Sequence, residues 1–225
     1  MRAIILMFDS LNRHMLEPYA DTFVQTPNFT RLAEHTVMFE NFYAGSMPCM
    51  PARREMHTGR YNFLHRSWGP LEPFDDSVFE MLKNAGVHTH LASDHPHYRE
   101  DGGGTYHPRY TTAHGWRAKG VMPWYNELVH LPFFIWDPRK RGQETHSPAL
   151  AQTIDPAPTL LQYFEVEPTA DMQGHDLAKA HEGDMLPRDS ALFGLHGAHV
   201  NVTDGRWVYM RAAANADNTP LESSH

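Results

Sequence analysis

The chain is organised around residues 46–60, which read SMPCMPARREMHTGR. The stretch contains Cys49, the single cysteine of the 225 residues, which therefore has no disulfide partner within the chain. Pro48 and Pro51 flank it and disfavour a helix or a central strand through this point. Good helix formers follow Pro51, so Cys49 is expected in a rigid loop just before a helix, where backbone N–H groups favour anionic ligands.

Two interpretations of this cysteine are possible, a buried structural residue or part of a site for an oxyanion ester. The spacing Cys-x-Pro-x-Arg, followed by Thr58-Gly59, distinguishes them. A lone cysteine is commonly a buried structural residue. Here Arg53 adds a fixed cationic fork that suits an oxyanion ester. The stretch resembles the signature of the type I sulfatases, in the alkaline-phosphatase superfamily. In that family the cysteine is oxidised to formylglycine after translation, and the aldehyde hydrate attacks the sulfur of a sulfate ester.

Length and composition exclude several classes of protein. The 225 residues suffice for one domain with a real core. The net charge is -8 and there is no basic tract, which argues against nucleic-acid binding. No apolar run is long enough to span a membrane, and no signal peptide is recognisable. The chain as given is therefore expected to be cytoplasmic.

Residues 3–8 form a continuous apolar run, which predicts a strand buried on both faces. Asp9 follows at its carboxyl end, the edge where α/β sheets bind ligands, although a lone Asp could merely cap a turn. The resemblance implies that Asp9 and residue 49 are metal ligands, for Ca²⁺ or for Mg²⁺ or Mn²⁺. Sulfatases often carry two consecutive Asp residues here, whereas the second position is Ser10. Some relatives, including phosphonate monoester hydrolases, also manage with one.

A second polar segment, residues 93–98, follows a predicted parallel strand at 87–92. Sulfatases commonly carry Lys-x-His here, and the matching residues are His95 and His97. The resemblance implies that both contact the sulfate, with an imidazole replacing lysine. Two alternatives stay open: Asp94 and His95 as a metal pair, or a polar loop without function. His107 is expected to line the same pocket.

A second metal motif of the family, Asp-His-Gly or Asp-Asn-Gly, does not occur in the sequence. The resemblance therefore implies an internal deletion near residues 112–113. The segment that follows it contains Lys119, which matches the family's active-site lysine. Two ligands are too few for Ca²⁺, which takes six to eight oxygens. One hypothesis is that Asp94 replaces the lost carboxylate.

The remaining patterns place helices and strands in an α/β order. Strands are expected at 35–43 and 126–136, and helices at 75–85, at 147–152 and from Thr26-Pro27 and Asp155-Pro156 onward. Antiparallel strands are expected at 191–193, 199–202 and 207–209. The resemblance implies an alkaline-phosphatase-like, mainly parallel sheet sandwiched by helices over residues 1–185. Residues 186–225 would then begin a small antiparallel C-terminal subdomain.

The resemblance implies hydrolysis of a sulfate monoester. Cys49, as formylglycine hydrate, would be the nucleophile, and Arg53 would hold the hydrate and the developing charge. His97 would take the proton when the sulfated hemiacetal collapses, while Lys119 and His95 would neutralise the sulfate oxygens. The implied partners are a small-molecule or sugar sulfate ester and a formylglycine-generating maturation enzyme. The alternatives are a phosphonate monoester or phosphodiester hydrolase on the same scaffold, or an inactive remnant.

Overall fold

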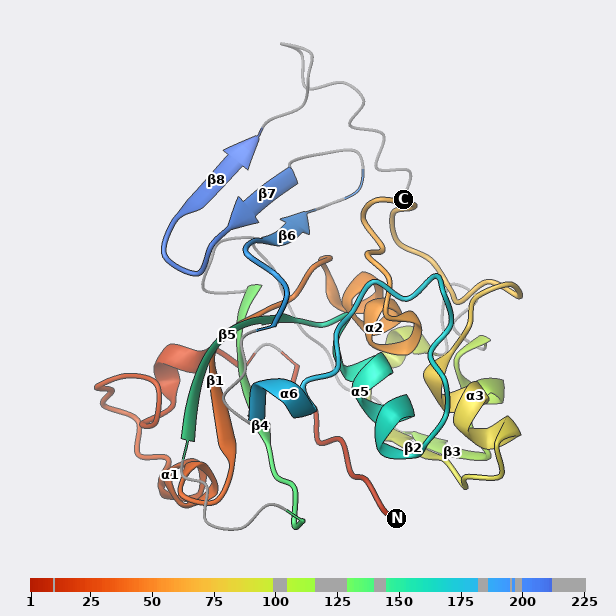
Figure 1. The fold of residues 1–225 in the computed structure, drawn as a ribbon, viewed down its shortest axis with the longest axis horizontal. Coiled ribbons are helices and arrows are strands. Elements are labelled where there is room, and N and C mark those ends of the chain that lie inside the picture. Colours follow the sequence, from red (N-terminus) through yellow and green to blue (C-terminus); the bar gives the residue numbers. More distant parts are fainter. Residues whose placement is uncertain are drawn as a thin grey trace.

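The computed structural model describes residues 1–9, 11–98, 105–115, 129–139, 145–181, 186–194, 196 and 200–211. Figure 1 shows its helices and strands with the labels used below. The α-helices are α1 Pro27–Ala33, α2 Cys49–Thr58, α3 Val78–Asn84, α5 Pro156–Tyr163 and α6 Ala178–His181. The strands are β1 Val37–Tyr43, β2 His90–Ser93, β3 Thr112–Gly115, β4 His130–Ile135, β5 Thr145–Gln152, β6 Ala191–Gly194, β7 Val200–Thr203 and β8 Val208–Arg211. Short 3₁₀ helices cover Arg13–Met15, Pro96–Tyr98 and His107–Arg109.

A mixed sheet of order β4-β1-β5 holds the largest part of the core. Strand β1 pairs antiparallel with β4 and parallel with β5, as expected for strands at 35–43 and 126–136. Phe39 and Phe42 of β1 are buried, and Phe133 of β4 stacks on Phe42 with ring centroids 4.0 Å apart. Leu177, just before α6, is fully buried in the same cluster and covers one face of the sheet.

The helix expected at 147–152 is wrong, because these residues belong to β5. Ala149 and Ala151 are buried in the core cluster with β1, and Leu150 and Ala151 pair with Asn41 and Phe42 of β1. Pairing along a sheet edge fixes the backbone more strongly than the helix propensity of alanine and leucine does. The helix expected from Asp155-Pro156 is confirmed as α5, with Pro156 at its first position.

The buried strand expected at 3–8 is also wrong. Residues 1–8 have no strand geometry, and Ile4 and Leu6 are 94% and 77% exposed. A strand buried on both faces needs paired neighbours and cover on each side. Among the described residues, the sheets pair β1 to β8 only with one another and leave this segment as coil (Figure 1).

A second, two-stranded parallel sheet joins β2 to β3. The parallel strand expected at 87–92 and the helix expected at 75–85 are confirmed in kind, as β2 and α3. Gly86, just beyond α3, has φ +84°, as expected for the residue that ends a helix. Residues 112–113 lie inside β3, and the deletion expected there stays a prediction.

The third sheet is antiparallel, with order β6-β7-β8, and it confirms the strands expected after residue 190. Gly205 turns between β7 and β8 with φ +88°. The sheet is tied to the stretch before α2, since Gly194 pairs with Ser46 and its N–H donates to the Gly45 carbonyl at 2.9 Å. The chain is therefore an α/β fold with parallel strand pairs and a separate antiparallel sheet.

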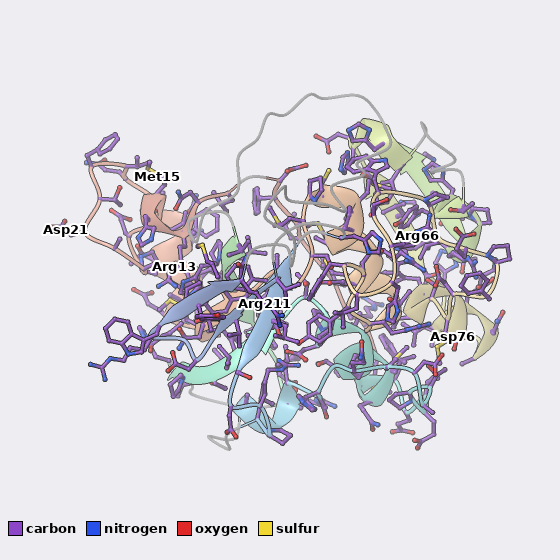
Figure 2. The ribbon with its side chains drawn as sticks, turned by 90° about the horizontal axis from the view of Figure 1, so that it is seen from above. Arg13, Met15, Asp21, Arg66, Asp76 and Arg211 are labelled. Carbon is purple, nitrogen blue, oxygen red and sulfur yellow. The ribbon has the colours of Figure 1, made fainter. Side chains whose placement is uncertain are left out.

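The sheet β4-β1-β5 and the helices α2 and α3 lie on different sides of the molecule (Figure 1). Figure 2, seen from above, places Arg13 and Met15 at one end and Arg66 and Asp76 at the other. None of the helices in the described part of the chain is long and apolar enough to cross a membrane.

Candidate active site

Helix α2 carries Cys49 at its first position, with Pro48 as the preceding cap residue. The sequence placed Cys49 in the loop before the helix, and this is corrected by one turn. Pro51 lies inside the first turn, where a backbone N–H has no partner within the helix, so proline costs no hydrogen bond there. Arg53 follows Cys49 by one turn and thus lies on the same face of α2.

The opposite side of α2 is fixed by Glu55, which is fully buried. Its carboxylate accepts hydrogen bonds from the hydroxyls of Ser46 and Thr153 and from the N–H of Asn62 at 3.1 Å. Burial raises the pKa of Glu55 to about 7, although these donors lower it. Glu55 thereby joins the loop before α2, the turn after it and the end of β5.

Arg54 and His57 anchor the helix to a different segment. The Arg54 guanidinium forms two hydrogen bonds to Asp75, at 2.9 and 2.7 Å, and a third to Asn62 at 2.9 Å. The His57 ring lies 2.9 Å from the Ser77 hydroxyl, and burial lowers its pKa to about 3. Glu55 on one side, and Arg54 and His57 on another, thus fix the position of α2. The face that carries Cys49 is not used by these contacts.

At that face the fold brings together Asp9, Cys49 and His95, whose ligand atoms all lie within 4.8 Å of one another. The Nε2 atom of His95 is 3.9 Å from the Asp9 carboxylate. Cys49 is half-buried and Asp9 is about half exposed. The three residues come from the N-terminal coil, the start of α2 and the loop after β2, so only the tertiary fold assembles them.

Arg53 borders this group. Its guanidinium lies 3.8 Å from the Asp9 carboxylate, donates to the Tyr98 hydroxyl at 3.3 Å and lies over the Tyr98 ring, 5.1 Å from its centroid. The side chain is only 12% exposed, so its charge is weakly screened by solvent. A cation held in this way can neutralise an oxyanion placed next to Cys49.

His97 and His107 lie among aromatic rings next to the Asp9, Cys49 and His95 group. The His97 ring packs edge-on against Trp68, at 4.7 Å, and against His95, at 5.2 Å. The His107 ring lies 6.2 Å from that of Tyr98, which separates it from Arg53. His97 is thus adjacent to the group, whereas His107 is one ring further away.

The structure does not bring Asp94 into the group, because its side chain is exposed and His95 takes the place beside Asp9. Lys119 lies outside the described residues, so its role stays a prediction. Of the two residues suggested as a metal pair, Asp94 and His95, only His95 lies in this group.

The site raises the pKa of one group and lowers that of another. Burial, and then the charge of Asp9, raise the pKa of the Cys49 thiol, while Arg53 opposes them. Burial, and then Arg53, lower the pKa of His95 to about 4. His95 is consequently neutral at pH 7, and it can donate or accept one hydrogen bond but brings no positive charge to a sulfate.

Several contributors were missed from the sequence. Trp68 and Tyr98 carried no motif that would single them out, and Glu55 looked like an ordinary helix residue. One signal in the sequence could have pointed to Glu55. It stands on the side of the predicted helix opposite Cys49, and an acidic residue that is buried there needs hydrogen-bond partners.

Solved structures with similar folds indicate the class of fold to which the chain belongs. The phosphonate monoester hydrolase of Agrobacterium radiobacter superposes with a TM-score of 0.73 and 13% identity, covering 91% of this chain and 86% of that one. A protein solved in complex with its substrate D-glucosamine-2-N,6-O-disulfate gives 0.71 at 10% identity, covering 92% and 87%. At such identities the likeness shows the fold alone, which is the alkaline-phosphatase-like α/β fold expected from the sequence.

The first half of the sequence is similar to one known family. Residues 2–103 match the sulfatase family model, and this segment includes Asp9, Cys49, Arg53, His95 and His97. Iduronate 2-sulfatase of Mus musculus is 29% identical over 118 residues, or 49% of this chain and 19% of that protein. The match thus spans about a fifth of the relative's length. Residues 2–103 are therefore similar to the sulfatase family, as the cysteine stretch indicated.

Proposed function

We propose that the chain is a sulfuric ester hydrolase in which Cys49, converted to formylglycine, is the nucleophile. One observation carries the proposal. Cys49 and Arg53 stand on the same face of a helix held from behind by Glu55 and Arg54, inside the segment that matches the sulfatase family. A nucleophile and an adjacent fixed cation are what attack on a sulfate ester requires.

The roles of the chain's own residues follow from their positions. The formylglycine hydrate at position 49 would attack sulfur, and the Arg53 guanidinium would balance the charge on the sulfate oxygens. Neutral His95 would donate a hydrogen bond to one of those oxygens. His97, against His95 and Trp68, is the proposed base for the collapse of the sulfated hemiacetal. Lys119 stays a proposed second cation.

The expected Ca²⁺ fits the described residues poorly. Ca²⁺ takes six to eight oxygen ligands, whereas the group offers one carboxylate, one sulfur or its formylglycine oxygens, and one imidazole nitrogen. We therefore assign no step to a calcium ion. The proposed substrate is a small-molecule or sugar sulfate ester, and a formylglycine-generating enzyme is the proposed partner in maturation.

The test is turnover by the full chain after coexpression with a formylglycine-generating enzyme. The mass of the tryptic peptide that ends at Arg53 reports conversion. Converted chain is expected to hydrolyse an aryl sulfate, while Cys49→Ala abolishes turnover and Arg53→Ala lowers it by at least about 100-fold, since electrostatic donors at reacting oxygens contribute that much. Asp94→Ala, exposed and outside the group, is the matched control and is expected to change little.

Aryl phosphonate turnover is the comparison arm. A ratio that favours the phosphonate would replace the sulfatase proposal with a phosphonate hydrolase on the same scaffold. Chain that is fully converted, folded and inactive on both esters would instead identify an inactive relative.

A further inference from the structure

The Asp9, Cys49 and His95 group has a donor set of its own, independent of any conversion of Cys49. It combines a carboxylate oxygen, a thiol sulfur and an imidazole nitrogen. Oxygen-only cages suit Ca²⁺ and Mg²⁺, whereas mixed sulfur and nitrogen ligands suit Zn²⁺ and neighbouring transition metals. The donor set that does not suit Ca²⁺ therefore suits Zn²⁺ and neighbouring transition metals.

His95 supplies a second, separate observation. The residue is only 7% exposed, and its Nε2 atom is buried without a hydrogen-bond partner among the described residues. Buried polar atoms are rarely left in this state, because each costs desolvation energy that a partner would offset. The Asp9 carboxylate lies 3.9 Å from this atom, beyond hydrogen-bond distance. The atom is therefore aimed at the group and lacks the ligand that would satisfy it.

We propose that Asp9, unmodified Cys49 and His95 bind a zinc-class divalent cation through oxygen, sulfur and nitrogen. Zinc bonds of about 2.0 to 2.3 Å put tetrahedral ligand atoms roughly 3.5 Å apart. The present separations, all within 4.8 Å, thus need a contraction of at most about 1.3 Å at each pair. Three protein ligands leave one of four tetrahedral positions open, as in catalytic rather than structural zinc sites.

Charge is balanced by the same residues. Bound thiolate and Asp9 together neutralise a divalent cation, and Arg53, 3.8 Å from Asp9, leaves one positive charge over. This surplus favours an anion in the open position. The proposal concerns the unconverted thiol and does not rest on the proposed sulfatase activity.

Cobalt absorption is the sharpest probe, because the 17 histidines could bind Zn²⁺ elsewhere while Cys49 is the single cysteine. Full-length chain from a host without maturation enzyme is titrated with Co²⁺, and Zn²⁺ then displaces it. Thiolate-to-cobalt charge-transfer absorption at one equivalent is expected. Its absence in folded wild type would overturn the proposal without any variant.

The variants then test the ligand set. Losing an outer partner of a metal ligand costs about 10- to 100-fold in affinity, so His95→Gln and Asp9→Asn are each expected to weaken binding by at least 100-fold. Cys49→Ser should remove the charge-transfer band, while the control Asp94→Asn should leave both band and affinity unchanged. Equal losses in Asp94→Asn and Asp9→Asn would overturn the assignment. Melts with excess Ca²⁺ should show no shift where Zn²⁺ raises the melting temperature.

Discussion

The charged residues of α2 divide into two roles that their sequence neighbours do not distinguish. Arg53 and Arg54 are adjacent, yet Arg53 faces Cys49 while Arg54 is buried against Asp75. The signature spacing predicted Arg53 as a site residue. It could not predict Glu55, because two of its partners, Ser46 and Thr153, are 9 and 98 positions away.

Glu55→Gln is expected to change the pH dependence of stability. The folded-state pKa is raised from 4.5 to about 7, so between these values the folded chain holds a proton that the unfolded chain has lost. The contribution of Glu55 to the free energy of unfolding is therefore full below pH 4.5 and is lost as pH rises through 7. The variant lacks this decline, which amounts to roughly 3 kcal/mol. Urea melts from pH 4 to 8 measure it, and parallel profiles for both proteins would contradict the assignment.

Arg54→Ala is expected to destabilise the chain by about 3 to 5 kcal/mol, since it leaves the buried Asp75 carboxylate without its cation. Arg66→Ala is the matched control. Its pair with Glu72 is partly exposed and is expected to contribute about 1 kcal/mol or less. Urea denaturation of both variants gives the comparison, and equal losses would argue against a structural role for Arg54.

At the scale of elements, local patterns predicted helices and strands where packing agreed with them. Strand β1, α3 and α5 lie where periodicity and capping residues placed them. The two failures have one cause, which is that a short apolar run takes its conformation from its neighbours. Residues 147–152 became a strand because β1 offers an edge, and residues 3–8 did not because no described strand pairs with them.

Gly174→Ala tests a close approach between elements. A Cβ atom there would lie 2.1 Å from the Ile154 carbonyl oxygen, at the turn between β5 and α5. Because that neighbour is backbone, the substitution is expected to cost about 3 kcal/mol or more. Gly86→Ala is the control: it has open space and only a left-handed φ, which costs about 1 kcal/mol. A thermal melt in which both variants lose equally would show that the contact is absent.

For the whole molecule, the boundary expected at 185/186 separates two sheets that nevertheless share a core. Phe193 and Ala191 of β6 are buried with Tyr43 of β1 and Leu150 of β5. The sequence could not show this, because strand patterns do not reveal which sheet a strand packs on. The class of fold and the likeness of the first half to sulfatases were predictable, since one short signature indicates both.

Phe193→Ala is accordingly expected to lower the stability of the whole chain by about 3 to 5 kcal/mol, in one cooperative transition. Trp207→Ala, at a residue 68% exposed just before β8, is expected to change it by less than about 0.5 kcal/mol. Denaturation followed by circular dichroism distinguishes them. Separate unfolding of residues 186–225 in the Phe193→Ala variant would instead show an independent unit.

The exposed coil of residues 1–8 has a consequence for how Asp9 acts. Asp9 contacts Arg53 and His95, and the neighbouring Phe8 packs on Phe29 with ring centroids 5.9 Å apart, but no described strand pairs with this segment. The position of Asp9 beside Cys49 therefore depends on the path of this coil and not on a paired strand. A ligand that gathers Asp9 must also dock this coil, so occupancy of the site and protection of residues 1–8 from proteases should rise together.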